Sequence, residues 1–114
     1  MDARIPATRR RLPQRRSSAT FELNFWGQKF AVGIGYYPDG QIGEVFVSTE
    51  KTGGQIEALA RDAAILISLA LQFGAPLETI QHAVTRDGSG AATSILGAII
   101  DAITTKPFPE RGAR

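Results

Sequence analysis

The sequence has no cysteine and only one histidine, His82. Disulfides, thiolate chemistry, cysteine-ligated zinc, iron–sulfur clusters and a histidine-rich metal site are therefore excluded. Most enzyme mechanisms lose their usual functional groups with them. We expect a chain that is not catalytic by itself and that holds no metal and no cofactor.

Long apolar segments are also lacking. The longest apolar run, residues 63–71, is interrupted by Ser68 and reaches about half the length of a membrane span. The N-terminal region carries arginines but lacks the apolar stretch of about 7–15 residues that a secretory signal contains. We therefore expect a soluble, cytoplasmic protein with no membrane partner and, at 114 residues, one small domain.

Charge is distributed unevenly along the chain. Residues 1–18 contain six arginines and one aspartate, a formal charge of +5. Residues 19–114 contain seven lysines or arginines and ten acidic residues, a formal charge of −3. A basic segment on an acidic body is expected to contact something anionic: phosphate, an acidic partner surface or the body of a second copy.

The basic segment, residues 1–18, has two prolines and, after Met1, only Ile5 and Leu12 as large apolar groups. It buries too little surface to offset its loss of conformational entropy, so we predict a flexible or partner-ordered arm. The folded domain is expected at residues 19–106, with a frayed tail at 107–114. The arginines predicted to bind a partner or nucleic acid are Arg9, Arg10, Arg11, Arg15 and Arg16.

Between residues 20 and 50 the apolar residues alternate with a period of two, which predicts three strands. Trp26-Gly27-Gln28 and the segment 37–41, which contains Pro38 and Gly40, are expected to be the turns of an antiparallel meander. The middle strand has a nearly bare face, over which we expect a helix or a second subunit's strand. That face consists of Ala31, Gly33 and Gly35.

After residue 54 the apolar period changes to 3.6, which predicts a helix of about 19 residues that ends at Gly74 and Pro76. A short helix at 76–85 and a third helix capped by Thr93 or Ser94 follow. Because residues 63–71 are apolar almost all round, we expect the long helix to be buried on more than one side, as in a dimer. The residues predicted to self-associate are Ala63, Leu66, Ile67, Ala70 and Leu71.

This order of elements predicts an α+β fold, a three-stranded antiparallel meander followed by three helices packed on one face. The same order of signals resembles the TSCPD domain over roughly residues 9–103. The segments that carry the resemblance are Arg11-Leu12-Pro13-Gln14-Arg15-Arg16, the strand Gly43-Glu44-Val45-Phe46-Val47, the Gly53-Gly54 break, Ile67-Ser68-Leu69-Ala70-Leu71-Gln72-Phe73-Gly74 and the following Pro76-Leu77-Glu78.

That family occurs near the C-terminus of adenosylcobalamin-dependent ribonucleotide reductases and as short free-standing proteins. Its naming motif, Thr-Ser-Cys-Pro-Asp, would fall at residues 93–97, where Ile95 replaces the cysteine. A thiol-dependent role is therefore absent, and the catalytic barrel, cobalamin site and nucleotide sites of the reductase have no counterpart. The resemblance implies an accessory domain without the enzyme.

The loop before the third helix is a further candidate site, because helix N-termini attract anions. The residues of this candidate anion site are Ser89, Gly90, Thr93 and Ser94. It lacks the lysine of a phosphate-binding P-loop and does not follow a strand. His82 is expected to be a surface helix residue.

We therefore hypothesise a non-catalytic accessory or interaction domain that self-associates through its long helix as a homo-oligomer. Its arm would engage an unidentified protein partner. An alternative is a small nucleic-acid-binding protein that uses the arm with little sequence specificity, since residues 1–18 contain no aromatic side chain for base stacking. A third hypothesis is an enzyme that acts on a small ligand near His82 or residues 88–90.

Overall fold

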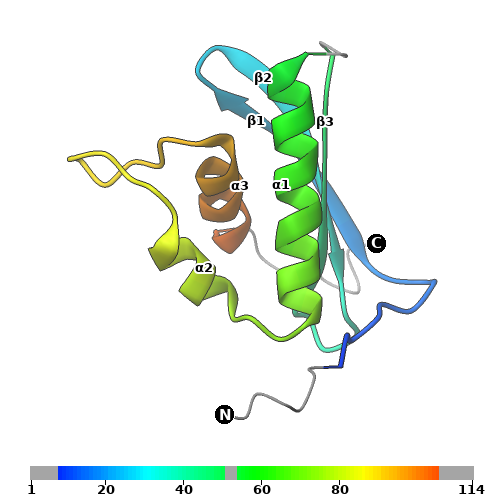
Figure 1. Ribbon diagram of the computed structural model, residues 1–114. Coiled ribbons are helices and arrows are strands. Elements are labelled where there is room, and N and C mark those ends of the chain that lie inside the picture. Colours follow the sequence, from blue (N-terminus) through cyan, green and yellow to red (C-terminus); the bar gives the residue numbers. More distant parts are fainter. Residues whose placement is uncertain (1–7, 51–53, 106–114) are drawn as a thin grey trace.

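The computed structural model describes residues 8–50 and 54–105, so the predicted tail at 107–114 and the first seven residues of the predicted arm lie outside the described part. The chain forms three strands and then three helices (Figure 1). The elements are β1 (Ser18–Phe25), β2 (Gln28–Tyr36), β3 (Ile42–Thr49), α1 (Gln55–Gln72), α2 (Leu77–Ala83) and α3 (Ile95–Thr104).

The strands form one antiparallel sheet in the order β1-β2-β3, which confirms the predicted meander. Trp26 and Gly27 make the turn between β1 and β2, and both have positive φ, 50° and 78°. A two-residue hairpin turn of this kind follows the right-handed twist of the strands. Glycine adopts such a φ readily, whereas tryptophan does so rarely.

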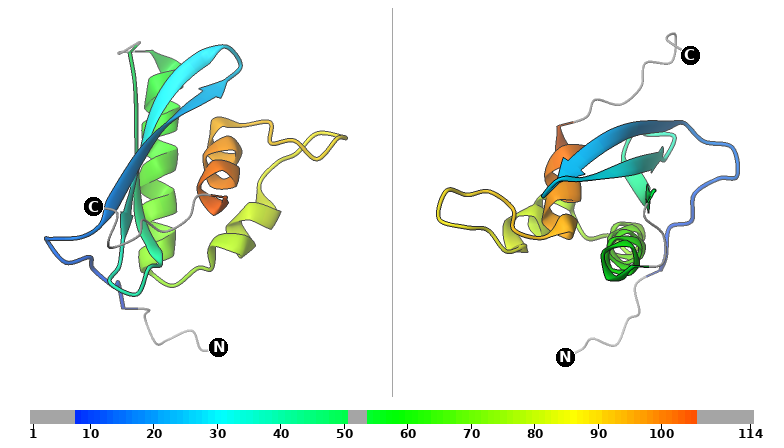
Figure 2. Two further views of the ribbon diagram at one scale, coloured as in Figure 1. Left: turned by 180° about the vertical axis from the view of Figure 1, so that it is seen from behind. Right: turned by 90° about the horizontal axis from the view of Figure 1, so that it is seen from above.

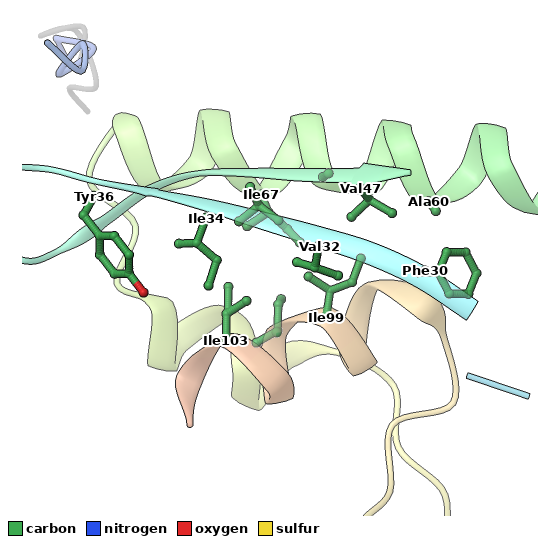
Figure 3. Close-up of a cluster of buried hydrophobic side chains, with 12 residues drawn as sticks. Phe30, Val32, Ile34, Tyr36, Val47, Ala60, Ile67, Ile99 and Ile103 are labelled. Atoms are coloured by element: carbon green, nitrogen blue, oxygen red, sulfur yellow. The ribbon is translucent and has the colours of Figure 1, made fainter. Parts of the chain in front are cut away.

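All three helices lie on one face of the sheet, as predicted (Figures 1 and 2). Between the layers is a core of large side chains to which β2 contributes most (Figure 3). Burying this apolar surface is the main favourable term in folding, at about 25 cal/mol per Å². The core residues are Phe30, Val32, Ile34, Tyr36, Val45, Val47, Ala60, Ala64, Ile67, Ile99, Ile100 and Ile103.

The bare face of β2 is filled differently from our expectation. Gly33 and Gly35 pair across the ladder with Phe46 and Glu44 of β3. A side chain at Gly35 would collide with the Glu44 carboxylate, and one at Gly33 would touch the Phe46 ring. Gly35 therefore makes room for the Glu44 side chain, whereas a Cβ at Gly33 would make only ordinary van der Waals contact. The helix expected over this face lies on the opposite face of the sheet.

Helix α1 runs along the free edge of β3 and forms hydrogen bonds to its backbone. Ser68 Oγ accepts from Val45 N at 2.8 Å and lies 3.2 Å from Val45 O and 2.8 Å from Ala64 O, either of which can receive its proton. Gln72 Nε2 donates to Gly43 O at 2.8 Å. These bonds satisfy edge groups that would otherwise be open to pairing with another chain.

A second polar network joins α2, the following loop and α3. Arg86 forms two parallel bonds of 2.8 Å from Nη1 and Nη2 to the two carboxylate oxygens of Asp101. Its guanidinium also donates to the carbonyls of Gln81 and Gly90. The hydrogen bond from Arg86 is the main reason that the pKa of Asp101 is lowered from its ordinary value. Such two-pronged contacts fix orientation as well as adding energy.

None of the helices in residues 8–50 and 54–105 is long and apolar enough to cross a membrane.

Replacement of Ser68 by alanine tests the contact between α1 and the edge of β3. The change leaves the Val45 N–H partly buried without its partner, which typically costs about 1–2 kcal/mol of unfolding free energy. Urea unfolding followed by circular dichroism measures this loss. Ser48→Ala, on the exposed face of the same strand, is the matched control and should change stability by less than about 0.5 kcal/mol. Equal effects of the two changes would contradict this account.

We expect the loss of the Arg86–Asp101 ion pair at low pH to contribute to the fall in stability of the folded chain. Because the pKa of Asp101 is lower in the folded chain than in the unfolded chain, its stabilisation is present above about pH 4 and is lost as pH falls below that value. Asp101→Asn should lower stability by about 1 kcal/mol at pH 7 and flatten the loss between about pH 4 and pH 2.

Urea titrations of the unmodified chain and of Asp101→Asn at pH 7, about pH 4 and about pH 2 measure these differences in stability. Glu22→Gln is the control, since Glu22 is exposed on β1 and forms no ion pair with any described residue. The same flattening in the control would show that the effect does not come from the pair.

Candidate partner-binding site

The described part of the arginine segment, residues 8–17, lies against its own domain (Figure 1). Arg10 N donates to the carbonyl of Gln72, at the end of α1, at 2.7 Å. Tyr36 N donates to Ser17 O at 3.0 Å, which ties the segment to the end of β2 just before β1 begins. The predicted flexibility of this arm stays a prediction.

Arg10 is held by several groups of the turn between β2 and β3. Its guanidinium lies 3.8 Å from the centroid of the Tyr37 ring, a cation–π contact. Nη2 also donates to Asp39 at 3.1 Å, and the Tyr37 hydroxyl donates to the Arg10 carbonyl. The pKa of Asp39 is lowered by the Gln41 backbone N–H first and by Arg10 second. Burial raises the pKa of Tyr37, although the positive charge of Arg10 opposes this.

Two more arginines of the segment bind the same edge of the domain. Arg9 Nε donates to Gln72 Oε1 at 2.7 Å, so the side chain and the carbonyl of Gln72 both hold the segment. Arg16 Nε donates to Glu44 and its Nη1 donates to the carbonyl of Pro13 at 2.6 Å. Gln72 thus connects the segment, α1 and β3 at one buried point.

The other two arginines are differently placed. Arg11 and Arg15 are exposed and form no hydrogen bond or ion pair with another described residue. Of the five arginines predicted to bind a partner, the structure therefore commits three to intrachain contacts and leaves two guanidinium groups available. Sequence analysis could not distinguish these two arginines from the other three, because all five are the same residue type in one short segment.

The residues predicted to self-associate fall on different sides of α1. Ala63 and Ile67 are buried against the sheet, Ala70 and Leu71 are half-buried, and Leu66 is 61% exposed. Other large apolar residues of α1 and its C-terminal cap are about half exposed, although the sequence analysis left them out of this set. They are Ile56, near the N-terminal end of the helix, Leu59, Ile65 and the cap residue Phe73.

Part of the candidate anion site before α3 is bonded to a carboxylate of the same loop. Asp87 Oδ1 accepts from Ser89 N and Oγ at 2.8 and 2.7 Å and from Ala91 N at 3.1 Å. These bonds, led by the Ser89 hydroxyl, lower the pKa of Asp87. Gly90 N donates to the Asp87 carbonyl. The Ser89 and Gly90 donors of this loop are therefore engaged within the chain, and anion binding before α3 stays a prediction.

The rest of this candidate site has structural roles. Ser94 is the N-cap of α3, and its Oγ accepts from Gly97 N at 3.1 Å. Thr93 bonds to the carbonyl of Thr85. Ile95, at the place of the motif cysteine, packs against the core. The sequence predicted a cap at Thr93 or Ser94, and Ser94 takes that role.

Catalytic groups do not converge in the described residues. His82 is exposed on α2, while Ser68 is engaged with β3. No group of three or more acidic or histidine side chains that could hold a metal ion occurs in residues 8–50 and 54–105. The arrangement offers surfaces for recognition: two unengaged guanidinium groups and an exposed apolar helix side.

Trp26 is a further exposed group. It is 82% exposed at the tip of the β1–β2 hairpin, where it stacks on Phe25 with ring centroids 5.3 Å apart. Phe30, Tyr36 and Tyr37 are buried, so they form no exposed aromatic surface with Trp26.

Comparison of the sequence with known proteins relates this chain to one domain family. The sequence profile of the TSCPD domain matches residues 4–106. A vitamin B12-dependent ribonucleotide reductase of Agrobacterium fabrum is 39% identical over 81 residues, which is 71% of this chain and 6% of that enzyme. The corresponding protein of Rhodopirellula baltica is 38% identical over 72 residues, 63% of this chain and 7% of the relative.

The chain therefore spans only a small part of the relatives that it matches. The same-named protein of Bradyrhizobium diazoefficiens, 35% identical over 77 residues, is matched over 6% of its length. No solved structure gives a significant match. With a profile match at residues 4–106, nearly the whole chain of 114 residues, this protein belongs to the TSCPD domain family.

Proposed function

We propose that this chain is a non-catalytic recognition domain that self-associates through the outward side of α1 and engages an acidic protein partner with its arginine segment. The observation that carries the proposal is the row of large apolar side chains on α1, among them Leu59, Leu66 and Phe73, that no described element covers. It rests also on the lack of converging reactive groups described above.

The energetics favour burial of this row by another protein surface. Fully burying a leucine side chain contributes about 1.5–3 kcal/mol, and contiguous apolar surface on a soluble chain often marks an interface. Leu59 and Leu66, on the outward side of α1, are 53% and 61% exposed, whereas the other side of the helix is well packed. A second copy or a partner that covered them would gain this burial.

The arginine segment is suited to an acidic surface. Arg10, stacked on Tyr37 and bonded to Asp39, and Arg16, bonded to Glu44, hold the chain on either side of the two unengaged arginines, Arg11 and Arg15. Fixing the backbone in advance lowers the entropy lost on binding. Guanidinium groups bind carboxylates through two parallel hydrogen bonds, which makes acidic side chains their natural partners.

The relatives are named vitamin B12-dependent ribonucleotide reductases, and the match covers 6–7% of the length of the first three. We extend to this chain an accessory role only. It has no cysteine, so it would not supply a thiol to any redox step.

Leu66→Ser tests the self-association. Removing one centrally placed leucine from an interface should weaken the dimer about tenfold to a hundredfold, as its loss of burial implies. Light scattering coupled to size-exclusion chromatography across micromolar concentrations measures the change. Phe46→Ser, at a similarly exposed apolar position on the opposite face of the sheet, is the matched control and should leave the dimer unchanged.

A monomer at all concentrations in the unmodified chain would contradict self-association. Dissociation by Phe46→Ser but not by Leu66→Ser would place the interface on the sheet.

Nucleic-acid binding is the second candidate, favoured by the two unengaged arginines. If only Arg11 and Arg15 contact duplex phosphates, log K should fall with log salt with a slope of about −2. If all five arginines of the segment from Arg9 to Arg16 contact phosphates, the slope should be about −4.5. Fluorescence anisotropy with a labelled duplex measures this slope. Alanine at both positions should abolish the binding, while Arg61→Ala, on α1, should not. No binding at about 50 mM salt would remove this candidate.

A further inference from the structure

We infer that two copies of this chain pair through antiparallel α1 helices, and that the arginine segment of each copy lies beside Asp62 of the other. This inference rests on the proposed self-association and adds its orientation and its polar contact. It names the occupant of the exposed helix side as a second copy rather than an unrelated protein.

The outward side of α1 carries one continuous row of residues spaced alternately by three and four positions. This α1 seam consists of Leu59, Asp62, Leu66, Leu69 and Phe73. Such spacing aligns side chains along one stripe of a helix and is the pattern by which two helices pack against each other. At 1.5 Å per residue the seam is about 21 Å long.

Four of the five seam residues are exposed in the described chain, and the fifth, Leu69, is half-buried. In Figure 1 α1 lies over the sheet, and seen from above in Figure 2 α2 and α3 stand to one side of it. Leu59, Leu66 and Phe73 are 53%, 61% and 46% exposed. The opposite side of the helix is fixed to the sheet by Ser68 and by buried alanines, so the seam cannot turn inward.

Charge differs between the two ends of the seam. Near the N-terminal end is Asp62, which is exposed and forms no ion pair with a described residue. The neighbouring Glu57 lies 3.6 Å from Arg61 of the same helix. Residues 63–72 carry no charged side chain. At the C-terminal end the arginine segment is bonded to Gln72, directly beside Phe73, and brings Arg9, Arg10 and Arg11 there.

These charges decide the orientation. In a parallel pair the two Asp62 carboxylates would lie together and the two arginine segments would also lie together, and both arrangements are repulsive. In an antiparallel pair the acidic end of one seam meets the basic end of the other, and the helix dipoles also oppose each other favourably. Because one chain carries both halves of this complementary surface, a second copy is the occupant that fits it.

Arg11 is the group best placed to bind Asp62 of the partner. Arg9 and Arg10 already donate to Gln72 and Asp39 within their own chain, whereas Arg11 has no described partner. An ion pair between Arg11 and the other copy's Asp62 therefore breaks no existing contact.

Single cysteines introduced into this cysteine-free chain test the orientation. Leu59→Cys and Phe73→Cys variants, carrying tags of different size, are treated with a bismaleimide that reaches about two helical turns, or 11 Å. In an antiparallel pair, residue 59 of one copy lies near residue 73 of the other, while identical positions are about 21 Å apart. The mixture should therefore crosslink at least tenfold faster than either variant alone. Phe46→Cys measures random collision.

Each outcome has one meaning. Rapid crosslinking of Leu59→Cys or Phe73→Cys with itself would show a parallel pair and overturn this inference while leaving self-association intact. A dimer by light scattering in which no seam cysteine crosslinks above the Phe46→Cys rate would place the interface elsewhere. The absence of any dimer would refute the proposed self-association itself.

Charge reversal tests the contact with the arginine segment. Asp62→Arg should weaken the dimer about two- to fivefold at low salt, the range typical of an exposed ion pair. The double variant Asp62→Arg with Arg11→Glu should restore the affinity, because both ends of the seam are then reversed. Pairing Asp62→Arg with Arg15→Glu is the control. Failure of the Arg11 change to restore affinity beyond this control would overturn the proposed contact.

Discussion

The hydrogen bonds from α1 to the free edge of β3 are the constraint on which the other surfaces of this domain depend. Ser68 and Gln72 satisfy backbone groups of Val45 and Gly43, so the helix lies along the edge strand in one rotational setting. That setting determines which residues of a helix that is apolar almost all round enter the core and which remain outside. The remaining polar atoms of Gln72 then hold the arginine segment beside the end of the helix.

The sequence predicts most of the fold, because its signals are local. Alternation with period two, the Gly27 and Gly40 turns and the change to period 3.6 after residue 54 are sufficient for three strands, three helices and their packing on one face. The rotational setting of α1 is not local. With apolar residues on every side, the helical period does not indicate which side faces the sheet, and Ala63 and Ile67 were therefore grouped with the exposed Leu66. The heptad spacing from Leu59 to Phe73 was the available signal.

The candidate sites illustrate the same limit. Five arginines in one segment look alike in sequence, whereas the folded chain separates them through partners that lie 28–63 residues away, such as Glu44 for Arg16 and Gln72 for Arg9. The loop before α3 resembles an anion site in sequence, and in the fold a carboxylate two residues before Ser89 accepts from the Ser89 N–H and hydroxyl. Ser94 takes the capping role, and Ile95, at the place of the motif cysteine, packs against the core.

The position of Trp26 has a practical consequence for spectroscopy. The indole of the only tryptophan is already 82% exposed at the tip of a hairpin, where it stacks on Phe25. Its emission therefore reports on the geometry of that hairpin tip and changes little in polarity when the core unfolds. The buried tyrosines, Tyr36 and Tyr37, are the intrinsic chromophores that sense the packing of the interior.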